Sequence, residues 1–132
     1  MAYIENDGGR SRYFAGRAND CAARAMAIAL GRDYRDCYDE LATAHQRRSG
    51  ERTARKGVYK ADLSAVLARH GWHWQPAPVI DGRKARCADM PEGAVIVRMA
   101  RHFSAVIDGI AHDVFDPSDK MVYGYWQRQR SG

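Results

Sequence analysis

The sequence predicts an α+β fold in which N-terminal helices pack on a C-terminal, mostly antiparallel sheet. Two patterns support this prediction: apolar residues recur at helical spacing over 19–70, and they alternate or form short β-branched runs over 71–132. In addition, Asp108-Gly109 separates two β-branched runs, which is a strong local signal for a hairpin. A chain of 132 residues is expected to form a single domain, 1–132.

The first helix is expected over 21–30. Asn19 or Asp20 can cap its N-terminus, and Gly31 can end it. Because alanine makes up much of this segment, we expect the helix to lie close to its neighbours and to be largely buried. The preceding residues 1–18 are rich in Gly and Arg and have no clear period, so they are expected to form an extended arm or loop.

Two further helices are expected before the sheet. Asp33 can cap the second helix, whose apolar stripe begins at Tyr34 and ends near Ala44. The basic segment 45–57 is then expected to be a loop. The third helix is expected from about Lys60 to Arg69.

The sheet part is expected to hold four or five strands. They fall at 72–74, 94–99, 102–107, 110–115 and 121–126. A loop is expected over 76–93, and it contains Asp81-Gly82 and Cys87.

The basic residues are concentrated in one segment. The chain carries 21 basic and 16 acidic residues, for a net charge of +5. Between positions 47 and 60, six basic residues stand against Glu51, so this segment accounts for the whole excess. The six are Arg47, Arg48, Arg52, Arg55, Lys56 and Lys60. This segment is either a solvated loop or a local binding surface for an acidic protein or a nucleic acid.

Several classes of protein are not expected. No stretch is long and apolar enough to span a membrane, and the first nine residues lack the apolar core of a signal peptide, so a soluble, cytoplasmic protein is expected. The three cysteines, Cys21, Cys37 and Cys87, predict no disulfide framework because their number is odd. The spacing of His70 and His73 does not suit a zinc site. No metal or cofactor is therefore expected.

A candidate catalytic group begins with Cys21. A helix N-terminus and a neighbouring protonated histidine both favour ionisation of a thiol, and Cys21 stands at the expected start of the first helix. His102, at the start of a strand, is placed to hold the thiol proton. A carboxylate on the partner strand would orient the imidazole ring.

The hairpin leaves two candidates for that carboxylate. If Asp108-Gly109 is a two-residue turn, Asp113 shares a face with His102. If the turn has three residues and a glycine bulge, the register shifts by one and Asp116 joins that face. His112 is a competing base, although a two-residue turn directs it away from His102.

Three strings of the sequence carry a family resemblance: Asn19-Asp20-Cys21, His102-Phe-Ser-Ala-Val-Ile-Asp-Gly109 and Asp113-Val-Phe-Asp116-Pro117. They resemble the papain-like cysteine peptidase superfamily, and are most similar to its compact bacterial and bacteriophage members, including the bacteriocin-processing type. The stretch from about 19 to 126 also resembles small phage and prophage proteins of that fold. The resemblance therefore implies a papain-like α+β fold.

The resemblance also implies roles for individual residues. Cys21 would be the nucleophile, His102 the general base and Asp116 the orienting carboxylate, with Asp113 as the second choice. Papain-like enzymes usually carry a glutamine before the cysteine that completes the oxyanion hole, and 14–20 contain none. Asn19 is the candidate for that donor. The loss of one such donor typically lowers the rate about 10²- to 10³-fold.

Two functions are consistent with these residues. The first is a cysteine hydrolase (a peptidase, isopeptidase or amidase) that acts on a peptide or protein through Cys21. The alternative is a non-catalytic papain-like protein of the phage type that binds a host protein or nucleic acid through the basic segment 47–60.

Overall fold

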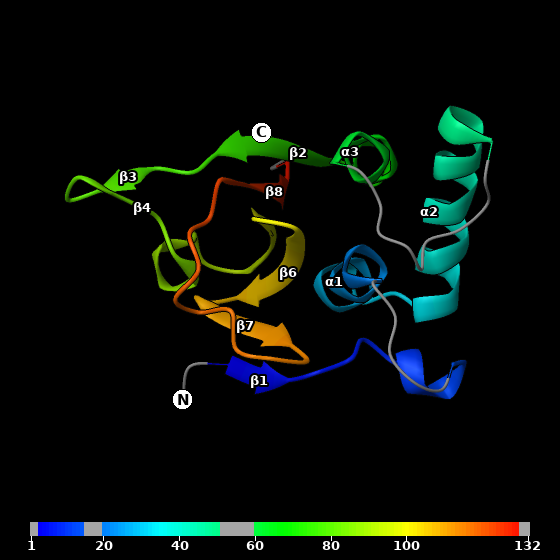
Figure 1. The fold of residues 1–132 in the computed structure, drawn as a ribbon, viewed down its shortest axis with the longest axis horizontal. Helices are drawn as coiled ribbons and strands as arrows, with labels where there is room; N and C mark the ends of the chain where they lie inside the picture. The colour runs from blue at the N-terminus through cyan, green and yellow to red at the C-terminus, as the bar shows by residue number, and fades with distance from the viewer. Residues whose placement is uncertain (1–2, 15–19, 51–59, 130–132) are drawn as a thin grey trace.

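Three helices lie beside a six-stranded sheet in the computed structural model, which describes residues 3–14, 20–50 and 60–129 (Figure 1). The helices are α1 (Cys21–Leu30), α2 (Tyr34–Ser49) and α3 (Lys60–Arg69). α1 lies between the sheet and α2, and α3 contacts both α2 and an edge strand (Figure 1). The α+β class and the packing of N-terminal helices on the sheet are confirmed.

The main sheet has the strand order β1-β7-β6-β5-β8-β2. Its strands are β1 (Tyr3–Glu5), β2 (Trp72–Pro76), β5 (Ala94–Met99), β6 (His102–Ile107), β7 (Ile110–Asp113) and β8 (Gly124–Arg128). Every neighbouring pair is antiparallel except β1 and β7, which run parallel. The sheet is therefore mostly antiparallel, as predicted, with one strand more than expected.

α1 is buried against one face of the sheet. Its first seven residues, 21–27, are all buried, and they share an apolar cluster with Ile96, Phe103 and Trp126. The small alanine side chains allow this close approach. The helix ends as predicted at Gly31, whose left-handed backbone (φ 66°) lets its N–H reach the Ala27 carbonyl.

The opposite face of the sheet carries a second apolar cluster. Val95, Val97, Met99, Val106 and Ala111 belong to it. The connecting segments cover this face with the buried side chains of Ala85, Cys87, Met90 and Val122. The sheet is thus buried on both faces.

The turn at Asp108-Gly109 fixes the register of β6 and β7. Ile107 pairs directly with Ile110, so the turn has two residues. Both turn residues have positive φ (51° and 80°), which is the conformation that Asp-Gly favours in a tight hairpin. The two-residue alternative from the sequence is therefore correct, and Asp113 lies on the His102 side of the pair.

Some boundaries differ from the prediction. α2 continues to Ser49, so the first five residues of the expected loop 45–57 are helical. β7 ends at Asp113 instead of Phe115, and the last strand is shifted two or three residues toward the C-terminus. These are shifts of element ends, which local sequence signals define poorly.

Two short elements are additional to the prediction. β1 forms within the segment expected to be an arm or loop. It is stabilised by pairing with β7, which is distant in the sequence, so no local pattern predicts it. Strands β3 (Val79–Ile80) and β4 (Arg83–Lys84) form a separate two-stranded ribbon around Asp81-Gly82, inside the expected loop 76–93. This turn carries the same Asp-Gly signal as the main hairpin. Among the helices that the structure describes, none is long and apolar enough to cross a membrane.

Candidate active site

Cys21, His102 and Asp113 come together where α1 meets the β6–β7 pair. Cys21 is the first residue of α1, His102 the first of β6 and Asp113 the last of β7. Because β6 and β7 are antiparallel, the start of one and the end of the other lie at the same edge. The three residues are 5%, 9% and 4% exposed, respectively, so the group is almost fully shielded from water.

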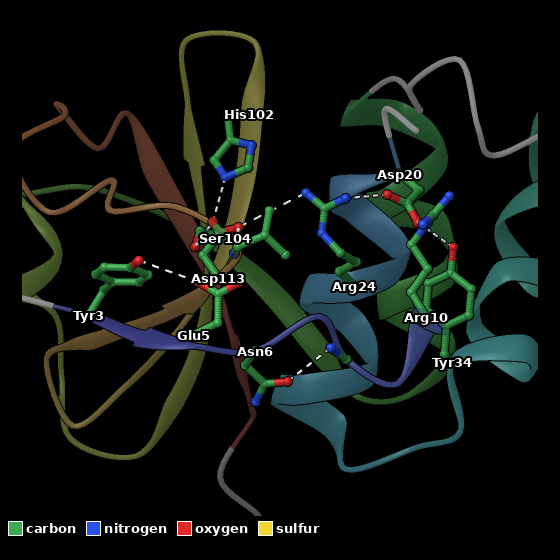
Figure 2. Close-up of polar contacts among 12 residues, drawn as sticks. Tyr3, Glu5, Asn6, Arg10, Asp20, Arg24, Tyr34, His102, Ser104 and Asp113 are labelled. Atoms are coloured by element: carbon green, nitrogen blue, oxygen red, sulfur yellow. Dashed lines mark hydrogen bonds and ion pairs between the residues drawn. The ribbon is translucent and has the colours of Figure 1, made fainter. Parts of the chain in front are cut away.

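The His102 ring bridges the other two residues. Its Nε2 atom lies 2.6 Å from Asp113 Oδ2 (Figure 2), and the Cys21 side chain lies close enough to help raise the pKa of His102. Because Nε2 is occupied by the carboxylate, Nδ1 is the ring nitrogen left for the thiol. The order thiol, imidazole, carboxylate is the arrangement that activates a cysteine nucleophile.

The electrostatics of His102 favour its protonated form. Burial by itself lowers the pKa of an imidazole, but the hydrogen bonds and negative charges of Asp113 and Cys21 outweigh burial and raise the pKa of His102 to about 9. A pKa of about 9 favours the imidazolium form at neutral pH, with the Asp113 carboxylate as its partner.

Asp113 is held by several donors. Ser104 Oγ donates to Oδ2 at 2.7 Å (Figure 2), and the Val114 N–H donates to Oδ1 at 2.7 Å. Burial acts to raise the pKa of Asp113, but the hydrogen bonds from His102 and Ser104 lower it below the usual aspartate value. The carboxylate is consequently ionised and fixed in orientation.

A second polar cluster adjoins this group at Asp20. The Asp20 carboxylate accepts hydrogen bonds from Tyr34 Oη and Arg24 Nη1, and it forms an ion pair with Arg10 Nε at 2.8 Å (Figure 2). Asp20 precedes α1 directly, yet its side chain makes no capping hydrogen bond. The prediction that the Asp20 side chain caps the helix is therefore wrong, because Arg10, Arg24 and Tyr34 bind its carboxylate instead.

Ser104, Arg24 and Arg10 belong to this region without having been predicted from the sequence. Arg24 Nη2 lies 4.0 Å from Asp113 Oδ1, so it connects the two polar clusters. The spacing of Asp20 and Arg24, four residues apart at the start of a helix, is a usable signal for that ion pair. Ser104 follows His102 by two residues on the same strand, so with a two-residue turn strand alternation places it on the His102 face opposite Asp113. Arg10 reaches the site through a tertiary contact that no local pattern marks.

Asp116, the first choice for the orienting carboxylate, is not the partner of His102. It is exposed, and its Oδ1 accepts a hydrogen bond from the Ser118 N–H at 2.9 Å. The reason is the two-residue turn, which places Asp113 and not Asp116 on the His102 face. The second choice, Asp113, occupies the position instead.

The other candidates near the site lie in different places. His112 pairs with Ala105, which places it on the face opposite His102, as a two-residue turn predicts. The Phe115 ring packs against the His102 ring with centroids 4.8 Å apart. Asn19, the candidate oxyanion donor, lies outside the described residues.

The other two cysteines, Cys37 and Cys87, are buried thiols with raised pKa values. All three cysteines are free thiols. Burial raises the pKa of Cys37 to about 12 and that of Cys87 to about 11. Both thiols are therefore protonated at neutral pH.

The candidate partner-binding segment is covered only in part. Arg47 is exposed near the end of α2, and Arg48 lies in the same helix. Arg52, Arg55 and Lys56 lie outside the described residues. Lys60 opens α3, and its Nζ lies 3.8 Å from the centroid of the Trp74 ring. The binding role of this segment stays a prediction.

Two open cavities lie away from the site. One, of about 620 Å³, is lined by 91–95 and 127–129. The other, of about 340 Å³, is lined by His73, Gln75, Gln127 and Gln129. Within the described ranges, no group of three or more His, Cys, Asp or Glu side chains is arranged to hold a metal ion.

Comparisons with family models, with curated proteins and with solved structures found no match.

Proposed function

We propose that this protein is a cysteine hydrolase with a papain-like site, in which Cys21 is the nucleophile, His102 the general acid and base, and Asp113 the orienting carboxylate. The observation that supports the proposal is the buried His102–Asp113 pair, 2.6 Å apart, beside the Cys21 thiol at the N-terminus of α1. A thiol at a helix N-terminus beside a protonated imidazole is the setting that produces a reactive thiolate.

The resting site is a thiolate–imidazolium pair in this proposal. The thiol proton resides on His102, whose pKa of about 9 keeps it protonated at neutral pH. Asp113 stabilises the imidazolium and holds the ring so that Nδ1 faces the sulfur. Ser104 and the Val114 N–H in turn hold Asp113.

Acylation begins when the Cys21 sulfur attacks the carbonyl carbon of an amide or ester. A C–S bond forms, and the carbonyl electron pair moves to oxygen. The tetrahedral intermediate then collapses: the carbonyl reforms, the bond to the leaving group breaks, and the leaving group takes the proton from His102. A thioester at Cys21 and a neutral His102 remain.

Deacylation reverses these roles. A water molecule attacks the thioester carbon while His102 accepts its proton. Collapse of the second intermediate breaks the C–S bond and releases a carboxylic acid product and the Cys21 thiolate. The N–H groups in the first turn of α1 have no partner within the helix, so they are candidates to bind the carbonyl oxygen as charge develops on it. Asn19 stays the proposed side-chain donor.

The proposed substrate is a peptide or protein amide, as the papain-like resemblance implies. The resemblance to compact phage-type members would place this activity in the cytoplasm of a bacterial host. Peptidase, isopeptidase and amidase activities share the chemistry above, and the site residues alone support all three.

Selective alkylation tests the proposal. We expect limiting iodoacetamide at about pH 6 to label Cys21 in the native protein, because an ordinary thiol is largely protonated at that pH. Peptide mapping identifies the labelled residue, and Cys37 and Cys87 are internal controls whose raised pKa values keep them unreactive. His102→Ala is expected to abolish the selectivity. Equally slow labelling of all three cysteines in the wild type would reject the hydrolase proposal.

A further inference from the structure

Arg24 connects two carboxylates that belong to different parts of the fold. It lies three residues after Cys21 on α1 and is buried. Its Nη1 atom donates to Asp20 Oδ1 at the start of the same helix, while Nη2 lies 4.0 Å from Asp113 Oδ1 on β7 (Figure 2). The guanidinium group therefore spans the distance between the start of the catalytic helix and the carboxylate that binds His102.

The N-terminal segment fixes the backbone on both sides of this contact. The Asn6 N–H donates to the Asp113 carbonyl at 2.9 Å, directly after β1 pairs with β7. Gly8 then lies against Arg24, so closely that a Cβ atom on Gly8 would be 2.9 Å from the Arg24 carbonyl oxygen. The relative position of Arg24 and Asp113 is thus set by main-chain contacts as well as by charge.

Arg24 shares its main carboxylate partner, Asp20, with a second arginine. Asp20 is shared by Arg24 and Arg10, and it also accepts a hydrogen bond from the Tyr34 hydroxyl. Asp20 is therefore shared by two arginines, so it balances only part of the positive charge of Arg24. Part of the Arg24 charge consequently acts on Asp113.

The two oxygens of Asp113 have separate partners. Oδ2 is bound by His102 and Ser104, whereas Oδ1 faces the Val114 N–H and Arg24. The Val114 N–H and the nearby cation together favour Oδ1 as their partner and leave Oδ2 for His102. It also lowers the negative potential that the carboxylate exerts on the imidazolium.

We propose that Arg24 is a positioning residue of this site: it holds Asp113 through Oδ1 so that Oδ2 stays with His102, and its charge keeps the imidazolium acidic enough to protonate a leaving group. The assignment of a catalytic purpose rests on the proposed function, but the effect of Arg24 on His102 does not. That effect can be measured without a substrate.

Titration of the His102 ring by NMR tests this proposal. In Arg24→Gln, the loss of a buried positive charge should raise the His102 midpoint by about half to one pH unit. Arg24→Lys retains the charge and should stay within about 0.3 unit of the wild type. Asp20→Asn should shift the midpoint in the opposite direction, to lower pH, because it leaves more of the Arg24 charge to act on Asp113. A general loss of packing would not produce opposite shifts.

The controls separate this proposal from the proposed function. Arg35→Gln removes an exposed arginine that is paired four residues away with Asp39, so it matches the chemical change but should leave the His102 midpoint unaltered. The positioning role is overturned if the His102 midpoint in Arg24→Gln is unchanged or lower than in the wild type. If Arg24→Gln does not fold, an unchanged or higher His102 midpoint in Asp20→Asn overturns it. The same titrations in a Cys21→Ala background measure the effect of Arg24 even if Cys21 proves unreactive to iodoacetamide.

Discussion

The structure contains two buried histidine–aspartate pairs, and they differ in what lies beyond the imidazole. His102 Nε2 contacts Asp113 Oδ2 at 2.6 Å on the β6–β7 pair, whereas His45 Nδ1 contacts Asp62 Oδ2 at 3.2 Å between α2 and α3. Both pairs are shielded from water. An imidazole bound to a carboxylate is thus not by itself evidence of an active site.

The thiol distinguishes the two pairs. His102 binds Asp113 through Nε2, and the Cys21 thiol lies near enough to help raise its pKa. The cysteine on the same helix as His45 is Cys37, eight residues earlier, which is about 12 Å along a helix axis. The His45 pair therefore joins two helices, whereas the His102 pair also lies beside a thiol at a helix N-terminus.

Replacing each histidine with alanine should give the largest difference between the two histidine–aspartate pairs. His102→Ala is expected to slow alkylation of Cys21 at about pH 6 on the order of a hundredfold, because the thiol loses its protonated partner. His45→Ala is expected to leave that rate unchanged and to lower the free energy of unfolding by about 1–3 kcal/mol, since it removes a partner of a buried carboxylate. Alkylation kinetics and urea unfolding measure the two effects. Equal loss of Cys21 reactivity in both variants would contradict the distinction.

The two carboxylates near His102 in the sequence provide a second contrast. Asp113→Asn should lower the pKa of His102 from about 9 toward its ordinary value, because it removes the carboxylate charge that raises it. Asp116→Asn is the matched control, and it should leave the His102 titration unchanged because Asp116 is bound to the Ser118 N–H. NMR titration of the His102 ring measures its pKa in both variants. A shift with Asp116→Asn and none with Asp113→Asn would favour Asp116 as the orienting carboxylate after all.

The smallest expected effect is on stability between pH 6.5 and 9. The folded-state pKa of His102, about 9, lies above the ordinary value of 6.5, so the folded state binds the proton more tightly than the unfolded state. Taken alone, this proton would give a stabilisation that is fully present below about pH 6.5 and is lost as the pH rises through 9. In the proposed pair, however, Cys21 is ionised in the folded state and binds a proton in the unfolded state up to about pH 8.5, so the two contributions largely cancel and the net change should be below about 1 kcal/mol. Urea unfolding at several pH values tests this: stability should fall with pH in Cys21→Ala and stay nearly level in the wild type, and parallel curves for the two proteins would contradict the pair.

Much of the site follows from local signals. Cys21 is predictable as the start of α1 because Gly31 marks the helix end and the apolar spacing marks its body. The Asp108-Gly109 turn predicts the hairpin that brings the ends of β6 and β7 together. These features depend on residues close in sequence, so one chain is sufficient to predict them.

The remainder depends on tertiary contacts. The choice between Asp113 and Asp116 requires the turn length, which shifts every later side chain by one face. Asp20 is a plausible helix cap by its sequence position, but its interactions with Arg10, Arg24 and Tyr34 determine its orientation instead. β1 escapes prediction because a three-residue strand is stabilised by its partner β7 and not by its own sequence.

The ultraviolet absorbance of a thiolate can detect the proposed thiolate–imidazolium pair of Cys21 and His102. We predict an absorbance equivalent to one thiolate per molecule in the native protein at about pH 6, which is lost in Cys21→Ser and in His102→Ala. Cys37 and Cys87 should contribute nothing at this pH because burial raises their pKa values to about 12 and 11. A wild-type protein with no thiolate absorbance until the pH exceeds about 8.5 would contradict the claim.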